Sequence, residues 1–181
     1  MSQFTETSPG NDSASCCSRD LNKPRVVVGI SELAVSDNPQ ELLITYSLGS
    51  CLGVSVYDPV NGIGGLIHCM LPLSSIDKEK AKTVPAMFVD TGIPHLFTKL
   101  FNLGSKKRDL VVKAAGCAQI LDPQGHFKIG ERNFTLLRKV LWKNEILLKA
   151  HDTGGGVSRT VSLDVASGKT VIRSGGQNRE L

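Results

Sequence analysis

Residues 45–68, TYSLGSCLGVSVYDPVNGIGGLIH, decide the fold of this chain. Apolar side chains alternate with small or polar ones over residues 51–57, a pattern typical of a β-strand. The DPVNG segment at 58–62 favours a turn, because Asp and Pro start turns and Asn-Gly tolerates positive φ. The largely apolar residues 63–71 then return as a second strand. Residues 51–71 are therefore predicted to form a β-hairpin.

The flanking segments add more strands than helices. Strands are predicted at residues 25–30, 41–48, 109–115, 145–149, 159–165 and 170–173. Helices are predicted at 95–103 and 131–143, the first with Pro94 in its opening turn and Gly104 as its C-terminal cap. One face of that first helix would carry Leu96, Phe97, Leu100 and Leu103. Residues 78–82 are expected to form a Lys-rich loop. Helices interspersed irregularly among strands indicate an α+β fold.

The length indicates one domain with two peripheral segments, since 181 residues fit one compact domain plus a tail. Residues 1–24 are polar, Ser-rich and aperiodic, so we expect a disordered leader. The domain is expected to span residues 25–175, and residues 176–181 to form a flexible tail.

The net charge of +4 excludes little but favours some partners over others. The tight basic run at residues 106–108 is short, and no basic stripe interleaved with aromatic residues accompanies it. The run therefore indicates a solvated loop and no nucleic-acid partner. A mild positive field would favour acidic protein partners.

The five cysteines indicate reduced thiols. Residues 1–24 lack the apolar core of a secretory signal, and no apolar run is long enough to span a membrane. We therefore expect a cytoplasmic protein with no membrane insertion, in which one thiol can serve as a nucleophile.

Cys51 is the candidate nucleophile, because it lies at a turn between two predicted strands. Gly49 and Ser50 precede it, where glycine permits a tight turn and close approach of a substrate carbonyl, and free backbone N–H groups there can stabilise an oxyanion. His68, on the returning arm of the hairpin, can act as base, and a paired histidine would lower the pKa of the thiol. Thr45 can accept a hydrogen bond from the second imidazole nitrogen.

Each of these residues also has a purely structural interpretation. Free cysteine packs like a small apolar residue, strand histidines are often hydrogen-bonded core residues, and threonine is common in strands. Cys69 is predicted to face the side of the sheet opposite His68, because strand neighbours alternate. That alternation also disfavours a zinc site made from Cys51, His68 and Cys69.

Beyond single residues, an ordered set of motifs resembles the CheD family of chemoreceptor glutamine deamidases. The motifs, in family order, are Gly49-Ser50-Cys51, Tyr57-Asp58-Pro59, Gly64-Gly65-Leu66-Ile67-His68, Met70-Leu71-Pro72, Phe88-Val89-Asp90, Lys113-Ala114-Ala115-Gly116, Ile129-Gly130-Glu131-Arg132-Asn133, and Asp152-Thr153-Gly154-Gly155 followed by Arg159. The resemblance covers residues 26–173.

The resemblance implies a Cys-His-Thr triad at Cys51, His68 and Thr45 that deamidates glutamine side chains of methyl-accepting chemotaxis receptors. It implies packed mixed β-sheets flanked by helices, related to the cytotoxic necrotizing factor deamidase toxins. It implies no metal or organic cofactor, and receptor cytoplasmic domains as substrates. The same acyl chemistry would hydrolyse glutamyl methyl esters.

Two features depart from the family pattern. Cys117 stands where a second glycine is usual, which leaves the local backbone open, and residues 1–24 have no counterpart. Arg132 and Asn133 fit either the rim of the site or a structural role at the start of a helix. The remaining histidines, His95, His126 and His151, are expected at the surface.

Two other functions stay open at this point. The chain could act mainly as a regulator that binds a CheC-type phosphatase, which the resemblance implies as a partner. It could also be an unrelated thiol hydrolase with the same fold. Release of ammonia from a receptor fragment would discriminate among these functions.

Overall fold

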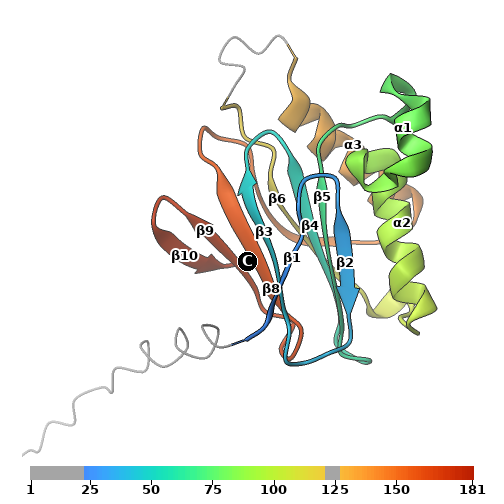
Figure 1. Ribbon diagram of the computed structural model, residues 1–181, viewed down its shortest axis with the longest axis vertical. Coiled ribbons are helices and arrows are strands. Elements are labelled where there is room, and N and C mark those ends of the chain that lie inside the picture. Colours follow the sequence, from blue (N-terminus) through green and yellow to red (C-terminus); the bar gives the residue numbers. More distant parts are fainter. Residues whose placement is uncertain (1–22, 121–126) are drawn as a thin grey trace, which may run out of the picture.

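A computed structural model describes residues 23–120 and 127–181 (Figure 1). The strands are β1 Arg25–Val27, β2 Leu33–Ser36, β3 Leu42–Leu48, β4 Leu52–Asp58, β5 Ile63–Cys69, β6 Val111–Gly116, β7 Leu148–Thr153, β8 Arg159–Asp164, β9 Thr170–Ser174 and β10 Gln177–Glu180. The α-helices among these residues are α1 Lys78–Thr83, α2 Val89–Asn102 and α3 Ile129–Lys143. The expected leader lies almost wholly outside the described residues, as does His126.

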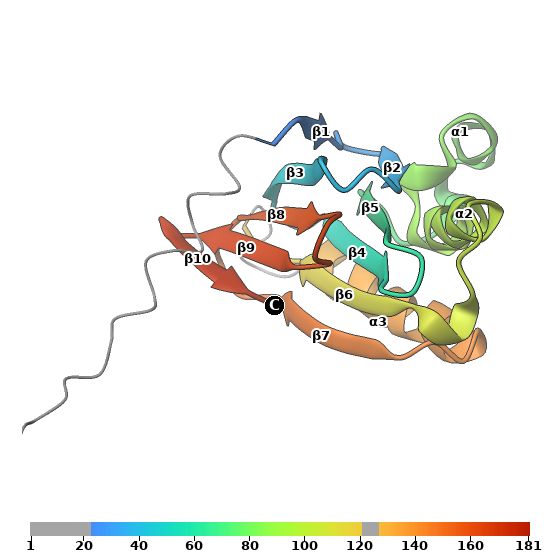
Figure 2. The ribbon, with the colours of Figure 1, turned by 90° about the horizontal axis from the view of Figure 1, so that it is seen from below.

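Two mixed five-stranded sheets pack face to face, and the helices cover the outer face of one of them. The first sheet has the order β1-β3-β8-β9-β10 and the second has the order β2-β5-β4-β6-β7. The pairs β1–β3 and β6–β7 are parallel, and the other pairs are antiparallel. Figure 2 shows the helices on the side of the second sheet that faces away from the first. The α+β class with mixed sheets and flanking helices is thereby confirmed.

The central hairpin β4–β5 is confirmed and separates two apolar cores. On one face of β4, Leu52, Val54 and Val56 are fully buried against α2 and α3. On the other face, Cys51 and Tyr57 pack against the apolar side chains of the first sheet. The period-two alternation that predicted the strand thus sorts its side chains between the helices and the facing sheet.

Helix α2 begins earlier than predicted, at Val89 instead of residue 95. Pro94 therefore lies inside the helix and not in its first turn, and the prediction was wrong. Val89 and Ile93 are fully buried against the second sheet, and their burial offsets the hydrogen bond that Pro94 cannot donate. Leu103, expected on the buried face, is 45% exposed beyond the last turn.

Three further segments differ from the predictions. Residues 78–83 form helix α1, where Asp77 accepts a hydrogen bond from the backbone of Lys80 as N-cap, and not a loop. Strand β7 begins at Leu148, because Glu145 takes a left-handed φ of 54° that ends α3. Residues 177–180 form β10, paired with β9, where a flexible tail was expected.

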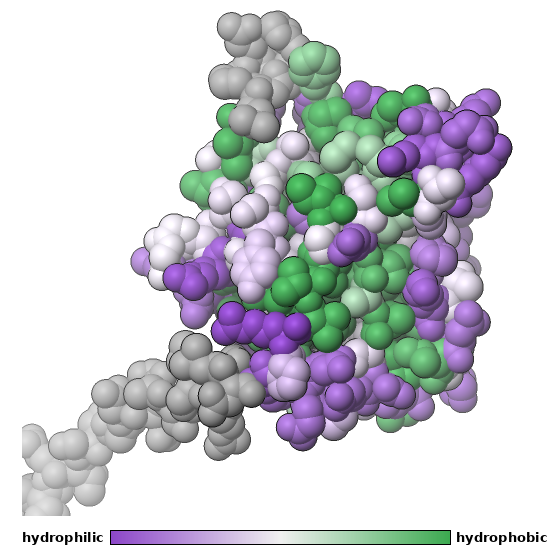
Figure 3. Space-filling model, in the orientation of Figure 1, coloured by the Kyte–Doolittle hydropathy of each residue, from purple (hydrophilic) through white to green (hydrophobic). Residues whose placement is uncertain are grey.

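The surface on the side of β1 and β2 is mixed in polarity. Figure 3 shows apolar side chains gathered over the middle of the face seen in Figure 1, within a hydrophilic rim. Val27, the last residue of β1, is 55% exposed, and Ile30, on the segment that leads to β2, is 62% exposed.

Gly130 tests the packing of α3 on the second sheet. A Cβ at this position would overlap the carbonyl oxygen of Cys117, so Gly130→Ala should lower the free energy of unfolding by about 1–3 kcal/mol. This expectation runs against helix propensity, which favours alanine by about 1 kcal/mol. Gly156→Ala is the control, because a Cβ there meets open space. Urea unfolding measures both variants, and an unchanged or stabilised Gly130→Ala would contradict the packing.

Candidate active site

The register of the hairpin brings Cys51 and His68 to one face of the second sheet. His68 pairs directly with Gly53 across β4 and β5. Cys51 lies two residues before Gly53 and therefore diagonal to His68 on the same face. The side chain of Leu48 occupies the space beside Gly53, where a Cβ on residue 53 would overlap it. The geometry brings together the two residues predicted from the sequence.

Thr45 joins His68 from the opposite sheet and fixes the tautomer of the ring. The hydroxyl of Thr45 donates to the carbonyl oxygen of Val28 at 2.7 Å. Because that hydroxyl has one proton, the 2.8 Å contact between Thr45 Oγ1 and His68 Nδ1 is a bond that Nδ1–H donates. The lone pair of the imidazole is then on Nε2, which is the nitrogen a general base needs free.

Burial keeps the His68 ring neutral. The residue is 1% exposed, and desolvation lowers its pKa to about 4. Nε2 is buried and has no hydrogen-bond partner among the described residues. A buried acceptor without a hydrogen-bond partner lowers the stability of a folded protein. Nε2 is therefore available to accept a hydrogen bond or a proton from a group that enters the site.

The pKa of the Cys51 thiol is raised by desolvation. The expected lowering of this pKa is not found, because its presumed partner His68 is itself neutral and offers no charge to stabilise a thiolate. At neutral pH the resting pair is therefore a thiol beside an uncharged imidazole. For Cys51 to act as a nucleophile, its proton has to move to His68 during attack.

The turn that carries Cys51 depends on a bulge at the end of β3. The pairing of β3 with β8 shifts between Thr45 and Leu48, and Ser47 adopts a φ of 56°. The extra residue turns Leu48 inward, where it is fully buried. Gly49, Ser50 and Cys51 then cross from the first sheet to the second, as bulges beside functional sites often redirect a chain.

Strand β6 and the residues after it hold this turn by its backbone. Cys117 N–H donates to the carbonyl of Cys51 at 2.7 Å, and Ala118 N–H donates to that of Gly49 at 2.8 Å. Gly116 lies so close that a Cβ would overlap the Cys51 carbonyl oxygen. Cys117 has a φ of 56°, a left-handed conformation that glycine would adopt without strain.

Asn133 is the site residue that sequence reasoning left undecided. Its Nδ2 donates to the carbonyl of Ser50 at 3.1 Å and to that of Met70 at 3.2 Å. It thereby ties the Cys51 turn to the end of the strand that carries His68. Asn133 is fully buried and lies at helical spacing with the core residues Leu137 and Leu141. A polar residue on an apolar stripe was the signal that could have identified it.

The other predicted residues lie apart from this group. Cys69 is fully buried among the side chains that face the helices, which confirms that it points away from His68. His151 is exposed and His95 partly exposed, as expected. Arg159, 6% exposed, pairs with Asp152 at 3.0 Å, and its strand position lies opposite Leu48. Its ion pair therefore supports the start of the turn.

A cleft next to the turn can admit a side chain. Its volume is about 140 Å³, and it is lined by Ser50, Ala118, Gln119, Ile120 and residues 127–130. The lining residues come from the Cys51 turn, the segment after β6 and the start of α3, so the cleft lies where these elements meet.

Among the described residues, no helix is long and apolar enough to cross a membrane.

Asn133→Ala should lower turnover more than its effect on folding explains. It leaves two part-buried carbonyls without the donor of Asn133, at a cost of about 1–3 kcal/mol, and frees the Cys51 turn from the His68 strand. Leu137→Ala, one helical turn further along α3, is the matched control, since it removes buried volume but no hydrogen bond. Turnover is measured well below both melting temperatures. Equal losses in the two variants would show that Asn133 acts only through stability.

Comparison with known proteins shows the family of this chain. The family model described as CheD chemotactic sensory transduction matches residues 70–174. The probable chemoreceptor glutamine deamidase CheD 1 of Syntrophus aciditrophicus is 50% identical over 157 residues, covering 86% of this chain and 98% of the relative. The probable chemoreceptor glutamine deamidase CheD of Solibacter usitatus is 45% identical, covering 87% and 93%. A solved structure, Neisseria meningitidis protein NMB0706, matches with a TM-score of 0.44 and 9% identity over 76% of this chain and 65% of that one. The chain belongs to the CheD family.

Proposed function

We propose that the chain is a cysteine amidohydrolase that converts glutamine side chains of chemoreceptor cytoplasmic domains to glutamate. The observation that carries the proposal is the buried Nε2 of His68, unpartnered on the face of the sheet that also carries Cys51. The proposal accords with relatives of up to 50% identity that are described as probable chemoreceptor glutamine deamidases.

In the first half of the reaction, the substrate carboxamide enters beside the Cys51 turn. Nε2 of His68 takes the thiol proton as Sγ attacks Cδ of the glutamine, forming the C–S bond. Backbone N–H groups near Gly49 and Ser50 are proposed to hold the oxyanion. His68 then returns the proton to the leaving nitrogen, the C–N bond breaks, ammonia departs, and a thioester remains.

In the second half, water replaces ammonia. His68 takes a proton from the water as its oxygen attacks the thioester carbon. The C–S bond breaks, the proton passes to Sγ, and the side chain leaves as glutamic acid, which gives its carboxyl proton to the solvent and becomes glutamate. Thr45 touches no substrate in this scheme; it keeps Nδ1 protonated and the ring in place, and its own bond to Val28 keeps it an acceptor. Every proton and electron pair is accounted for by these residues and water.

Three finer proposals follow from the same chemistry and from the family. A glutamyl methyl ester would react by the same steps, with methanol in place of ammonia. A CheC-type phosphatase is a proposed regulatory partner, to be tested by co-purification and by inhibition of ammonia release. Because the substrates are cytoplasmic domains, we also propose a cytoplasmic location. A fold similar to that of the cytotoxic necrotizing factor deamidase toxins stays a prediction.

Cys51→Ala should abolish deamidation of a purified receptor cytoplasmic fragment while leaving the melting temperature near that of the wild type. His68→Gln should be nearly as severe, since general acid–base catalysis alone contributes about 10²–10⁴-fold, and Thr45→Val should cost less. His95→Gln, at a partly exposed histidine on α2 outside the candidate site, is the control. Ammonia release and the mass shift of receptor peptides measure the outcome. Activity above about a tenth of wild type in Cys51→Ala would refute the nucleophile.

Alkylation tests the neutral resting pair. Because burial raises the Cys51 pKa, iodoacetamide should label Cys51 slowly at pH 6–7 and faster as the pH rises above the ordinary thiol range. Cys51 should still react before Cys117, whose pKa burial raises to about 12, and before the fully buried Cys69. The labelled peptide is identified by mass. Rapid labelling of Cys51 at pH 6 would show a thiolate–imidazolium pair in the free protein.

A further inference from the structure

A groove runs between α3 and β7, on the helix that also holds the Cys51 turn. This α3–β7 groove has a volume of about 740 Å³. It is lined by Phe134, Arg138, Trp142, Leu147 and His151, among others. Three of these residues, Phe134, Arg138 and Trp142, follow one another at four-residue spacing along α3, so the groove extends over about 12 Å of helix.

The floor and rim of the groove are unusually apolar for an exposed surface. Trp142, the one tryptophan of the sequence, is 84% exposed, and Leu147 is 86% exposed. Ile146 and Leu141 lie buried beneath them. Large apolar side chains that gather in a groove with a polar border are typical of interaction sites.

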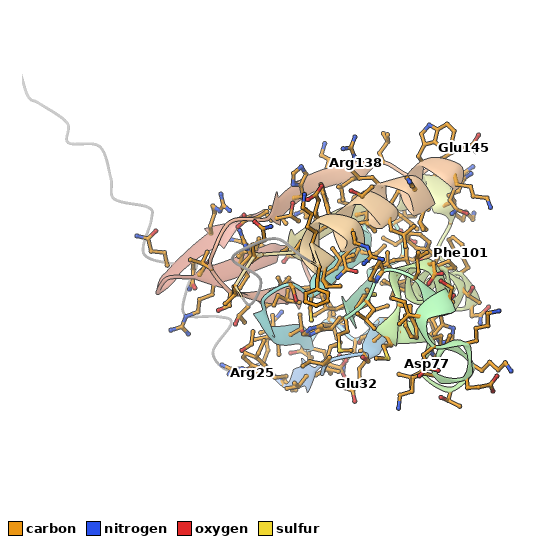
Figure 4. All side chains as sticks on the ribbon, turned by 90° about the horizontal axis from the view of Figure 1, so that it is seen from above. Arg25, Glu32, Asp77, Phe101, Arg138 and Glu145 are labelled. Atoms are coloured by element: carbon orange, nitrogen blue, oxygen red, sulfur yellow. The ribbon has the colours of Figure 1, made fainter. Side chains whose placement is uncertain are left out.

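Positive charge borders this apolar strip on the side of α3. Arg138 and Lys139 line the groove, and the exposed Lys143 follows Lys139 by one helical turn. None of these three forms an ion pair within the part of the chain that the structure describes. Figure 4 shows Arg138 on the outer side of α3, with Glu145 near the end of that helix.

The nearby carboxylates do not cancel this charge. Glu145 pairs with Lys107 at 2.8 Å, and Glu131 lies 3.8 Å from Lys128. The groove therefore presents an apolar strip with unpaired cations along its border. The complementary ligand is an amphipathic helix whose apolar side chains enter the groove and whose carboxylates meet the cations, the helix-in-groove mode of peptide recognition.

We propose that the α3–β7 groove docks an acidic amphipathic helix of the receptor substrate, as a contact separate from the one at Cys51. Asn133 holds the Cys51 turn from the first turns of α3, and Trp142 lies nine residues further on, about 14 Å along the helix axis. Helix α3 thus sets the distance between the docking contact and the reacting glutamine. The proposal rests on the proposed function for the identity of its partner.

Binding is measured on full-length Cys51→Ala, so that no reaction intervenes. The probe is a tryptophan-free peptide of about 18 residues, a Leu/Glu amphipathic helix, and the control is the same peptide with Lys in place of Glu. We expect the emission of Trp142 to shift to shorter wavelength and saturate with the acidic peptide alone. An equal response to the basic peptide, or to a DNA oligonucleotide of similar charge, would overturn the proposal.

Charge reversal locates the binding. Arg138→Glu combined with Lys139→Glu should raise the Kd of the acidic peptide at least about tenfold and remove most of its dependence on salt. Lys78→Glu combined with Lys99→Glu makes the same change of charge at exposed positions on α1 and α2, outside the groove lining, and should leave the Kd within about twofold. Similar losses in the two double variants would mean that net charge, and not the groove, binds the peptide.

Kinetics with the receptor fragment connect the groove to the reaction. In the otherwise wild-type chain, the Arg138→Glu and Lys139→Glu pair should raise KM for the fragment at least about tenfold with kcat unchanged. Alkylation of Cys51 by iodoacetamide should keep its wild-type rate. A fallen kcat or a changed alkylation rate would show that the groove acts on the catalytic turn itself. If the fragment is no substrate at all, the peptide titration still decides whether the groove binds an acidic helix.

Discussion

The hydrogen bond between Thr45 and His68 is the constraint on which the site depends, because it joins the two sheets. Thr45 belongs to β3 of the first sheet and His68 to β5 of the second. The Thr45 hydroxyl is itself committed to Val28, so the direction of the bond to the ring is settled. A chain of bonds from the β1 end through Thr45 therefore determines which imidazole nitrogen stays free. Packing the sheets in any other relative position would lose that bond and the base with it.

The Cys51 turn is held as firmly from the other side. Backbone bonds from Cys117 and Ala118 hold the carbonyls of Cys51 and Gly49, and Asn133 holds that of Ser50. These contacts come from the end of β6 and from α3, elements distant from the hairpin in sequence. A thiol that is neutral at rest needs this rigidity, since attack requires the sulfur, the imidazole nitrogen and the carbonyl carbon to be aligned when the proton moves.

Burial of Cys51 and His68 has a chemical consequence. Desolvation raises the pKa of Cys51 and lowers that of His68, so each shift opposes a charged pair. In the mechanism that we propose, the resting thiol is poorly reactive toward solutes, and a bound carboxamide displaces water and accepts the developing charge. In our proposal the α3–β7 groove supplies part of the binding energy for this event. Selection of the substrate is thus divided between a remote docking contact and the reacting centre.

The sequence by itself determined the central hairpin and the identity of the candidate site residues. Period-two alternation over residues 51–57 and the DPVNG turn sufficed for the hairpin, and the hairpin sufficed to bring Cys51 and His68 to one face. The tertiary structure alone decided the features that have no local sequence pattern. Strand β10 is polar, follows a turn of two glycines with positive φ, and has no apolar alternation from which it could be predicted. Three features depend on contacts between residues that are distant in the sequence: the direction of the Thr45 hydrogen bond, the hydrogen bonds from Asn133 to the Cys51 turn, and the pKa shifts. The reason is that desolvation and hydrogen-bond pairing are properties of the packed molecule and not of a single segment.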